Sequence, residues 1–194
     1  MLTDYNLQDI DGNTKLIIET INGNACKVKE LSIFTDCNIK NNTGDNALVI
    51  ACLWGKNDII KILIPYTNCN DKCSGGETPL TICSLSGNLE SVKLLIPYSN
   101  CNMKNNNGDT ALMLASLWDC TEVVKELAPR SNCNIKNNNG ATAIMLSCVF
   151  GNLAIIKILH KFTLLTITDD NFETIFDYAK RLGHPDIINF LYKI

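Results

Sequence analysis

The stretch GETPLTICSLSGNLESVKLLI, residues 76–96, indicates the fold most directly. Thr78 is a good N-cap, and Pro79 suits the first helical position, where a missing N–H costs nothing. Gly87 ends this helix, because glycine adopts the left-handed conformation at least cost. A second helix follows, and its apolar residues recur at helical spacing: Leu89, Val92, Leu95 and Ile96. The stretch therefore predicts two helices joined by a short turn.

The same pattern recurs every 32 residues. One series of glycines comprises Gly12, Gly44, Gly76, Gly108 and Gly140. A second series ends the first helix of each unit at Gly23, Gly55, Gly87, Asp119, Gly151 and Gly183. The single aspartate in this series fits, because Asp tolerates the left-handed conformation better than most residues. Prolines 65, 97 and 129 are predicted to close the second helices of their units.

Six such units fill almost the whole chain, which leaves no room for a separate catalytic domain. We expect one domain over residues 1–194, with units at about 6–37, 38–69, 70–101, 102–133, 134–165 and 166–194. The fold class predicted is all-α, a solenoid of stacked helix-turn-helix units with short loops resembling β-hairpins.

Three stretches of the chain resemble ankyrin repeats. They are the stretch at 76–96 quoted above, GDTALMLASLWDCTEVVKEL at 108–127, and TIFDYAKRLGHPDIINFL at 174–191. The resemblance covers about residues 5–194. Two departures from the family pattern stand out. The period is one residue short, and histidine is absent from the T-P-L-H position, which holds Val49, Thr81, Met113 and Met145. The resemblance implies a module that binds other proteins.

Charge and composition argue against several classes of function and indicate a cellular compartment. The net charge of −3 argues against nucleic acid as a partner, since nucleic-acid binders usually carry a basic face. The sequence contains no apolar run long enough to span a membrane and does not begin like a signal peptide. Ten cysteines without an export signal suggest a reducing, cytoplasmic compartment. We expect an intracellular monomer without a cofactor, and its asparagine-rich composition makes a role in a host cell plausible.

A polar phrase separates the units, as in NCNIKNNNGATAIML at 132–146 and NCNMKNNNGDTALML at 100–114. Asparagine and glycine supply turn conformations, so this phrase is predicted to form the loop between repeats. Its asparagines can hydrogen-bond the backbone of their own and neighbouring loops. By the family resemblance, Asn38, Asn70, Asn102 and Asn134 are also potential substrates of an asparagine hydroxylase.

The cysteines admit two interpretations. Cys37, Cys69, Cys101 and Cys133 form a ladder at the repeat period, and with Cys73 they could serve a protein that responds to metal or oxidant. Burial in place of a small aliphatic residue is favoured, because stacked helices lie about 8–10 Å apart, beyond the reach of a disulfide. We therefore predict no metal site. No nucleophile with a partnering histidine and no phosphate-binding loop is present, so no catalytic residue is predicted and the protein is expected not to be an enzyme.

Two charged ladders are expected near the hairpin tips. One contains Lys40, Lys72, Lys104 and Lys136, and the other contains Asp45, Glu77 and Asp109. The two ladders either neutralise each other or present an alternating surface to a charged partner. Another set of lysines, Lys29, Lys61, Lys93, Lys125 and Lys157, is predicted to lie on the solvated outer side of the second helices.

The strongest candidate binding residues precede the glycine that ends each first helix. By resemblance to the family, these positions point into the concave groove. The pairs are Ile21 and Asn22, Leu53 and Trp54, Leu85 and Ser86, Leu117 and Trp118, Val149 and Phe150, and Arg181 and Leu182. The four inner pairs are the candidate binding residues. Tryptophan is enriched among binding hot spots, and Ser86 shows that the fold needs no aromatic ring there. We predict a protein partner along this face, flanked by Asp45, Glu77, Asp109, Lys72 and Lys104, with the chain acting as an adaptor or an inhibitor.

Overall fold

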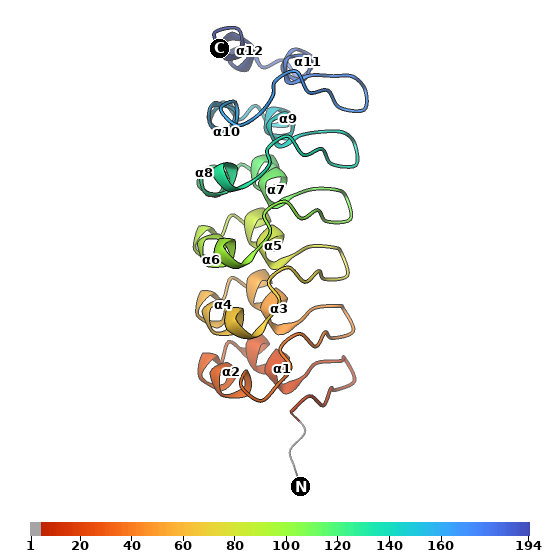
Figure 1. The fold of residues 1–194 in the computed structure, drawn as a ribbon, viewed down its shortest axis with the longest axis vertical. Coiled ribbons are helices and arrows are strands. Elements are labelled where there is room, and N and C mark those ends of the chain that lie inside the picture. The colour runs from red at the N-terminus through yellow and green to blue at the C-terminus, as the bar shows by residue number, and fades with distance from the viewer. Residues whose placement is uncertain (1–4) are drawn as a thin grey trace. The chain divides into compact units, whose positions relative to one another are not determined.

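The computed structural model describes residues 5–194, and this part of the chain is built from helices without a β-strand (Figure 1). A single isolated bridge joins Gln8 and Thr14. The chain divides into two compact units, residues 1–83 with 90–100 (unit 1) and residues 84–89 with 101–194 (unit 2). We describe each unit by itself.

The helices come in pairs. The first helices are α1 (Lys15–Asn22), α3 (Ala47–Leu53), α5 (Pro79–Leu85), α7 (Ala111–Leu117), α9 (Ala143–Val149) and α11 (Ile175–Arg181). The second helices are α2 (Ala25–Leu31), α4 (Asn57–Leu63), α6 (Leu89–Leu95), α8 (Thr121–Leu127), α10 (Leu153–Leu159) and α12 (Pro185–Leu191). This arrangement confirms the predicted all-α class of stacked helix-turn-helix repeats.

Packing follows the repeat order within each unit. In unit 1, α1 packs on α3 and α2 packs on α4. In unit 2, α7, α9 and α11 form one row, and α8, α10 and α12 form another (Figure 1). The side chains between the rows are fully buried, among them Leu63, Leu95, Leu127 and Leu159 at 0% exposure. The core is therefore a repeated apolar layer between the two rows of helices.

The second helices end slightly differently from the expectation. Three of them continue as a 3₁₀ turn that contains the proline: η1 (Ile64–Tyr66), η2 (Ile96–Tyr98) and η3 (Ala128–Arg130). The proline therefore lies inside the tightened last turn. This position is permitted because the missing N–H falls where the hydrogen-bonding pattern changes.

The turn between paired helices uses left-handed residues, as predicted. Asp119 has φ +58°, so aspartate adopts the conformation that glycine supplies in the other repeats. First helices such as α3 and α7 begin with side-chain caps. Thr110 Oγ1 accepts the N–H of Met113 at 3.3 Å, and Asn46 Oδ1 accepts the N–H of Val49 at 3.0 Å.

Each hairpin tip folds around one side-chain acceptor. In unit 1, Asn41 Oδ1 accepts the N–H groups of Thr43 and Asp45 at 3.1 and 3.0 Å. In unit 2, Asn137 Oδ1 accepts the N–H groups of Asn139 and Ala141 in the same way. The local hydrogen bonds of an Asx side chain therefore shape the tip without a β-ladder.

A second set of asparagines links neighbouring loops. Asn38 Oδ1 accepts the N–H of Asn68 at 2.9 Å, and Asn134 Oδ1 accepts the N–H of Leu164 at 2.8 Å. Asn6, which lies at the same repeat position, accepts the N–H of Asp36. These bonds explain why asparagine recurs at a fixed distance, since each residue satisfies a backbone donor of the next loop.

Candidate functional site

Three large aromatic side chains lie exposed at the ends of first helices. Trp54 follows α3, Trp118 follows α7 and Phe150 follows α9, each as the C-cap residue. Their exposed fractions are 67%, 59% and 67%. The backbone N–H of each residue caps its helix, for example from Trp118 to the carbonyl of Leu114. Only the backbone serves the helix, which leaves the ring free to contact another molecule.

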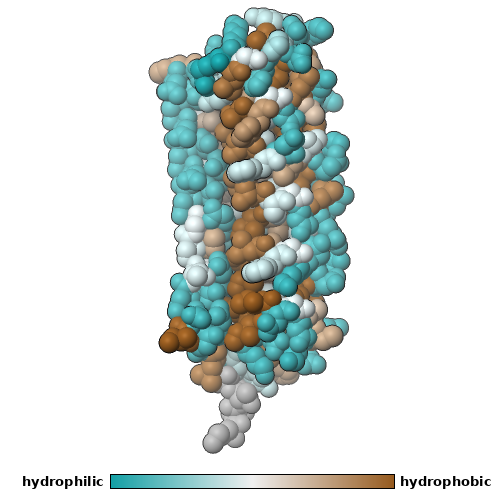
Figure 2. Space-filling model, turned by 180° about the vertical axis from the view of Figure 1, so that it is seen from behind, coloured by the Kyte–Doolittle hydropathy of each residue, from teal (hydrophilic) through white to brown (hydrophobic). Residues whose placement is uncertain are grey.

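Aliphatic residues accompany these rings in each unit, and we call the exposed residues at these helix ends the helix-end stripe. In unit 1 it comprises Leu53 and Trp54, and in unit 2 it comprises Leu85, Ser86, Leu117, Trp118, Val149 and Phe150. Leu53 is 55% exposed, Leu85 41% and Val149 37%, while Leu117 is half-buried. Figure 2 shows apolar side chains gathered on one face of each unit, flanked by hydrophilic side chains. The structure thus exposes the aromatic and aliphatic residues of the predicted set.

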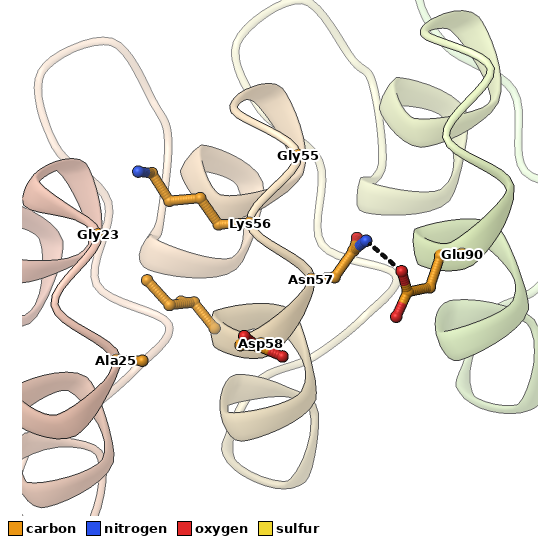
Figure 3. Close-up of a pocket in the computed structure, with 8 residues that line it drawn as sticks. Gly23, Ala25, Gly55, Lys56, Asn57, Asp58 and Glu90 are labelled. Carbon is orange, nitrogen blue, oxygen red and sulfur yellow. Dashed lines mark hydrogen bonds between the residues drawn. The ribbon is translucent and has the colours of Figure 1, made fainter.

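A cleft of about 440 Å³ lies beside the stripe of unit 1, and Gly55, the residue after Trp54, lines it (Figure 3). Its walls come from the turns before α2 and α4 and from Glu90. Asn57 Nδ2 donates to Glu90 Oε2 at 2.7 Å, and Lys61 Nζ lies 3.1 Å from Glu90 Oε1. Polar groups on this wall are therefore already paired with one another.

The same cleft recurs in unit 2 beside Trp118. A volume of about 320 Å³ is lined by Gly87, Asp119, Cys120, Thr121, Glu122 and Val123. Asp119 Oδ1 accepts hydrogen bonds from the side chains of Asn152 and Thr121. Gly55 and Asp119, the residues that directly follow the two tryptophans, line these hollows.

One of the two alternatives for the charged tips was that the lysine ladder neutralises the acidic one, and two of the carboxylates, Asp45 and Asp109, do not follow it. Lys40 Nζ lies 3.1 Å from Asp71 and donates to the carbonyl of Lys72 at 2.8 Å. Within residues 5–194, neither Asp45 nor Asp109 forms an ion pair with a lysine or arginine. Asp45 accepts instead from Thr43 Oγ1 at 2.8 Å. The lysine ladder therefore does not neutralise these two carboxylates.

The remaining predicted tip residues are distributed between the two units. Glu77 accepts from the Cys73 thiol at 3.3 Å and is half-buried. Lys72 in unit 1 and Lys104 in unit 2 are exposed. In unit 2, Asp109 and Leu117 line a common cleft.

The cysteine ladder is buried, as the packing interpretation predicts. Burial raises the pKa of the Cys133 thiol to about 11, and burial together with nearby Asp36 raises that of Cys37 to about 11. Cys26 is exposed and Cys120 is half-buried. Among residues 5–194 there is no group of three or more His, Cys, Asp and Glu side chains that could hold a metal ion.

Two features of the last repeat have no counterpart in the sequence predictions. Arg181 forms a two-pronged ion pair with Glu173, with Nε and Nη2 each 2.9 Å from a carboxylate oxygen. Phe172 has φ +64° at the position that glycine holds in the five preceding tips, and its side chain is 85% exposed. The glycine period, extended by one step to residue 172, was the signal that could have revealed this second feature.

In the part of the chain that the structure describes, none of the helices has the length and apolar character needed to cross a membrane.

Comparisons with known proteins agree with this architecture. A family model described as ankyrin repeats (3 copies) matches residues 1–73, 16–105, 66–137 and 121–194. The crystal structure of EF0377, an ankyrin repeat protein, is similar over 96% of this chain and 99% of that chain, with a TM-score of 0.85 and 22% identity. No curated protein sequence matches the chain.

Proposed function

Because the chain belongs to the ankyrin repeat family, whose members are generally protein–protein interaction modules, we propose that it binds a protein partner through the helix-end stripe without catalysing a reaction. The observation that carries this proposal is the exposure of Trp54, Trp118 and Phe150 at one repeat position. Large rings exposed at a position where the fold accepts serine are costly in water and valuable in an interface.

The clefts beside Trp54 and Trp118 support the same proposal. Binding hot spots are aromatic anchors in places from which a partner excludes water. A cleft of 320–440 Å³ that begins at the residue after each tryptophan can cover a partner side chain better than a flat surface can. Paired polar groups on the wall, such as Asn57 with Glu90, form a rim that adds orientation more than affinity.

The charged tips extend the proposed surface. Asp45, Glu77 and Lys72 belong to unit 1, and Asp109 and Lys104 belong to unit 2. Since Asp45 and Asp109 have no cationic partner within residues 5–194, a charged group of the partner can approach them without breaking an ion pair. An adaptor and an inhibitor would both use such a surface, and the cytoplasm of the producing cell or of a host is the proposed location.

The experiment that tests this function is site-specific photocrosslinking. A benzophenone amino acid replaces Trp54, Trp118 or Phe150 in turn, and in matched controls it replaces Lys29 or Lys125, which lie on second helices. We expect the stripe positions to capture one protein in common and the control positions to capture none of it. Capture of the same protein at Lys29 and Lys125 but not at the stripe would contradict the proposal.

A purified partner then allows a quantitative test. Trp54→Ala and Trp118→Ala should each weaken its binding by about 2 kcal/mol or more, the range of hot-spot residues. The urea midpoint of unfolding should stay close to that of the wild type, because both rings are mainly in solvent. Lys93→Ala, on the second helix α6, should leave binding unchanged.

A further inference from the structure

The last repeat contains an arginine held against a tip carboxylate. Arg181 ends α11, and Glu173 belongs to the hairpin tip of the same repeat. Two guanidinium nitrogens each lie 2.9 Å from the carboxylate, and the guanidinium carbon lies 4.9 Å from the centre of the Tyr178 ring. The space between a first-helix end and its hairpin tip can therefore hold a guanidinium in the forked geometry typical of arginine and carboxylate.

The corresponding space two repeats earlier lacks that arginine. Residues 64 positions before Glu173 and Arg181 are Asp109 and Leu117, so the carboxylate is present and the cation is replaced by an aliphatic residue. A cleft of about 300 Å³ opens there. Its lining consists of Asn107, Asp109, Leu117, Asn137, Asn138, Asn139 and Leu146. Both places lie in unit 2, so they can be compared directly.

The carboxylate of Asp109 keeps acceptor capacity in this cleft. Its Oδ1 accepts one bond from Asn137 Nδ2 at 2.8 Å, and no lysine or arginine within residues 5–194 is paired with it. Asn138 Nδ2 already donates a hydrogen bond to the carbonyl of Asn106, at 2.9 Å. A carboxylate can accept more bonds than the one recorded here. The cleft therefore offers negative charge and free acceptor positions beside two leucines.

We propose that this cleft receives an arginine side chain from the bound partner, so that the partner segment combines an arginine with a large apolar residue that covers Trp118. This inference rests on the proposed protein-binding function and specifies the chemistry of the partner. Arginine fits better than lysine, because its planar fork matches a carboxylate and its aliphatic stem can lie along Leu117 and Leu146.

The test uses a phage-displayed library of random 12-residue peptides selected on the whole chain. Selected peptides are counter-screened on Trp118→Ala, and those that lose binding are sequenced and synthesised. We expect arginine to be enriched at one position near an apolar residue. Replacement of that arginine by alanine should weaken binding to the wild type about tenfold or more, as expected when a close charge pair is lost.

Two variants examine the cleft itself. Asp109→Asn keeps an oxygen acceptor for Asn137 and removes the charge, and Leu117→Arg should place a guanidinium on Asp109 as Arg181 does on Glu173. Both should weaken the arginine peptide about tenfold or more, while the Ala-substituted peptide should bind Asp109→Asn and the wild type equally. Asp186→Asn, on α12, serves as the control and should bind like the wild type.

The outcomes separate the two proposals. Peptides that require Trp118 but show no arginine enrichment and bind Asp109→Asn normally would overturn this inference and leave the protein-binding function standing. A selection in which every peptide binds Trp118→Ala as well as the wild type would overturn the proposed function of the stripe, and the inference with it. Circular dichroism melts of each variant verify that lost binding does not come from unfolding.

Discussion

The Oδ1 atom of Asn70 accepts the backbone N–H of Asn100 at 2.7 Å, which ties one inter-repeat loop of unit 1 to the next. The Nδ2 atom of Asn70 also reaches the carbonyl of Tyr98, at 3.5 Å. One asparagine side chain therefore serves a backbone donor and a backbone acceptor of the following loop.

We predict that Asn70→Ala lowers the free energy of unfolding by about 1 kcal/mol, because the N–H of Asn100 loses its partner while water still reaches the loop. Urea titration followed by circular dichroism measures the change. Asn139→Ala is the matched control, since Asn139 lies at an exposed tip and only its backbone forms hydrogen bonds. Equal losses in the two variants would mean that the loop-to-loop bond contributes nothing specific.

The tip of the third repeat has a thiol where its neighbours have an Asx oxygen. Burial raises the pKa of Cys73, whereas the N–H groups of Gly75 and Glu77 donate toward its sulfur and lower it. Sulfur is a weak acceptor compared with an amide oxygen. Cys73→Asn should therefore stabilise the protein by about 0.5–1 kcal/mol, as Asn41 serves the same N–H groups in the preceding tip.

The control for this substitution is Cys69→Asn. Cys69 is buried at 4% exposure, so a polar amide there should destabilise the fold. Thermal melts of both variants provide the comparison. A fall in melting temperature for Cys73→Asn would show that its thiol contributes something an amide cannot replace, and would contradict the prediction.

Phe172 adopts the left-handed conformation at a position where the other tips have glycine. Side chains larger than hydrogen cost about 1–2 kcal/mol in this conformation. Since the ring is 85% exposed, little packing is lost on its removal. Phe172→Gly should therefore raise the free energy of unfolding by about 1 kcal/mol after the entropy cost of glycine is included.

The control for Phe172→Gly is the reverse type of substitution, glycine to a larger residue, at the equivalent position one repeat earlier, Gly140. A Cβ atom at Gly140 would lie 2.5 Å from the backbone nitrogen of Asp170, in the following tip. Gly140→Ala should therefore destabilise unit 2 through both the conformation and the close contact. If urea midpoints showed Phe172→Gly to be less stable than the wild type, the phenylalanine would have to be held by contacts that its exposure does not suggest.

The carboxylate of Asp169 makes the last tip sensitive to acid. Burial disfavours its charge, but N–H groups of Glu173 and Asn171, the Tyr178 hydroxyl and the Asn171 side chain outweigh burial and hold its pKa below the ordinary value of 3.8. A pKa lowered by folding means that ionised Asp169 stabilises the tip above about pH 4. This contribution is lost as the pH falls below about 4 through the folded pKa.

Asp169→Asn should remove that pH dependence, because Asn137 shows that an amide oxygen accepts the same two backbone bonds. Hydrogen exchange at the amides of Asn171 and Glu173, corrected for intrinsic rates, measures the local stability between pH 3 and 5. We expect protection to fall in the wild type and to change less in the variant. Asp177, whose pKa is lowered by hydrogen bonds from Thr174, remains in both proteins and contributes equally.

The sequence by itself determined the repeat, the helix pairs and the burial of the cysteine ladder. These features depend on local preferences: a cap such as Thr110, a left-handed residue such as Asp119, and apolar residues at helical spacing. The same period placed Trp54 and Trp118 at equivalent helix ends, and the structure finds both exposed there.

Only the tertiary structure decided which polar groups meet. Asn70 forms a hydrogen bond with a residue 30 positions away, and Lys40 pairs with Asp71 rather than with Asp45. Arg181 pairs with Glu173 in the last repeat, whereas the corresponding space beside Asp109 is an open cleft. The reason is physical. Helical periodicity fixes the direction of a side chain on its own repeat, whereas a hydrogen bond or ion pair needs distances within about 3–4 Å, which depend on how neighbouring repeats stack.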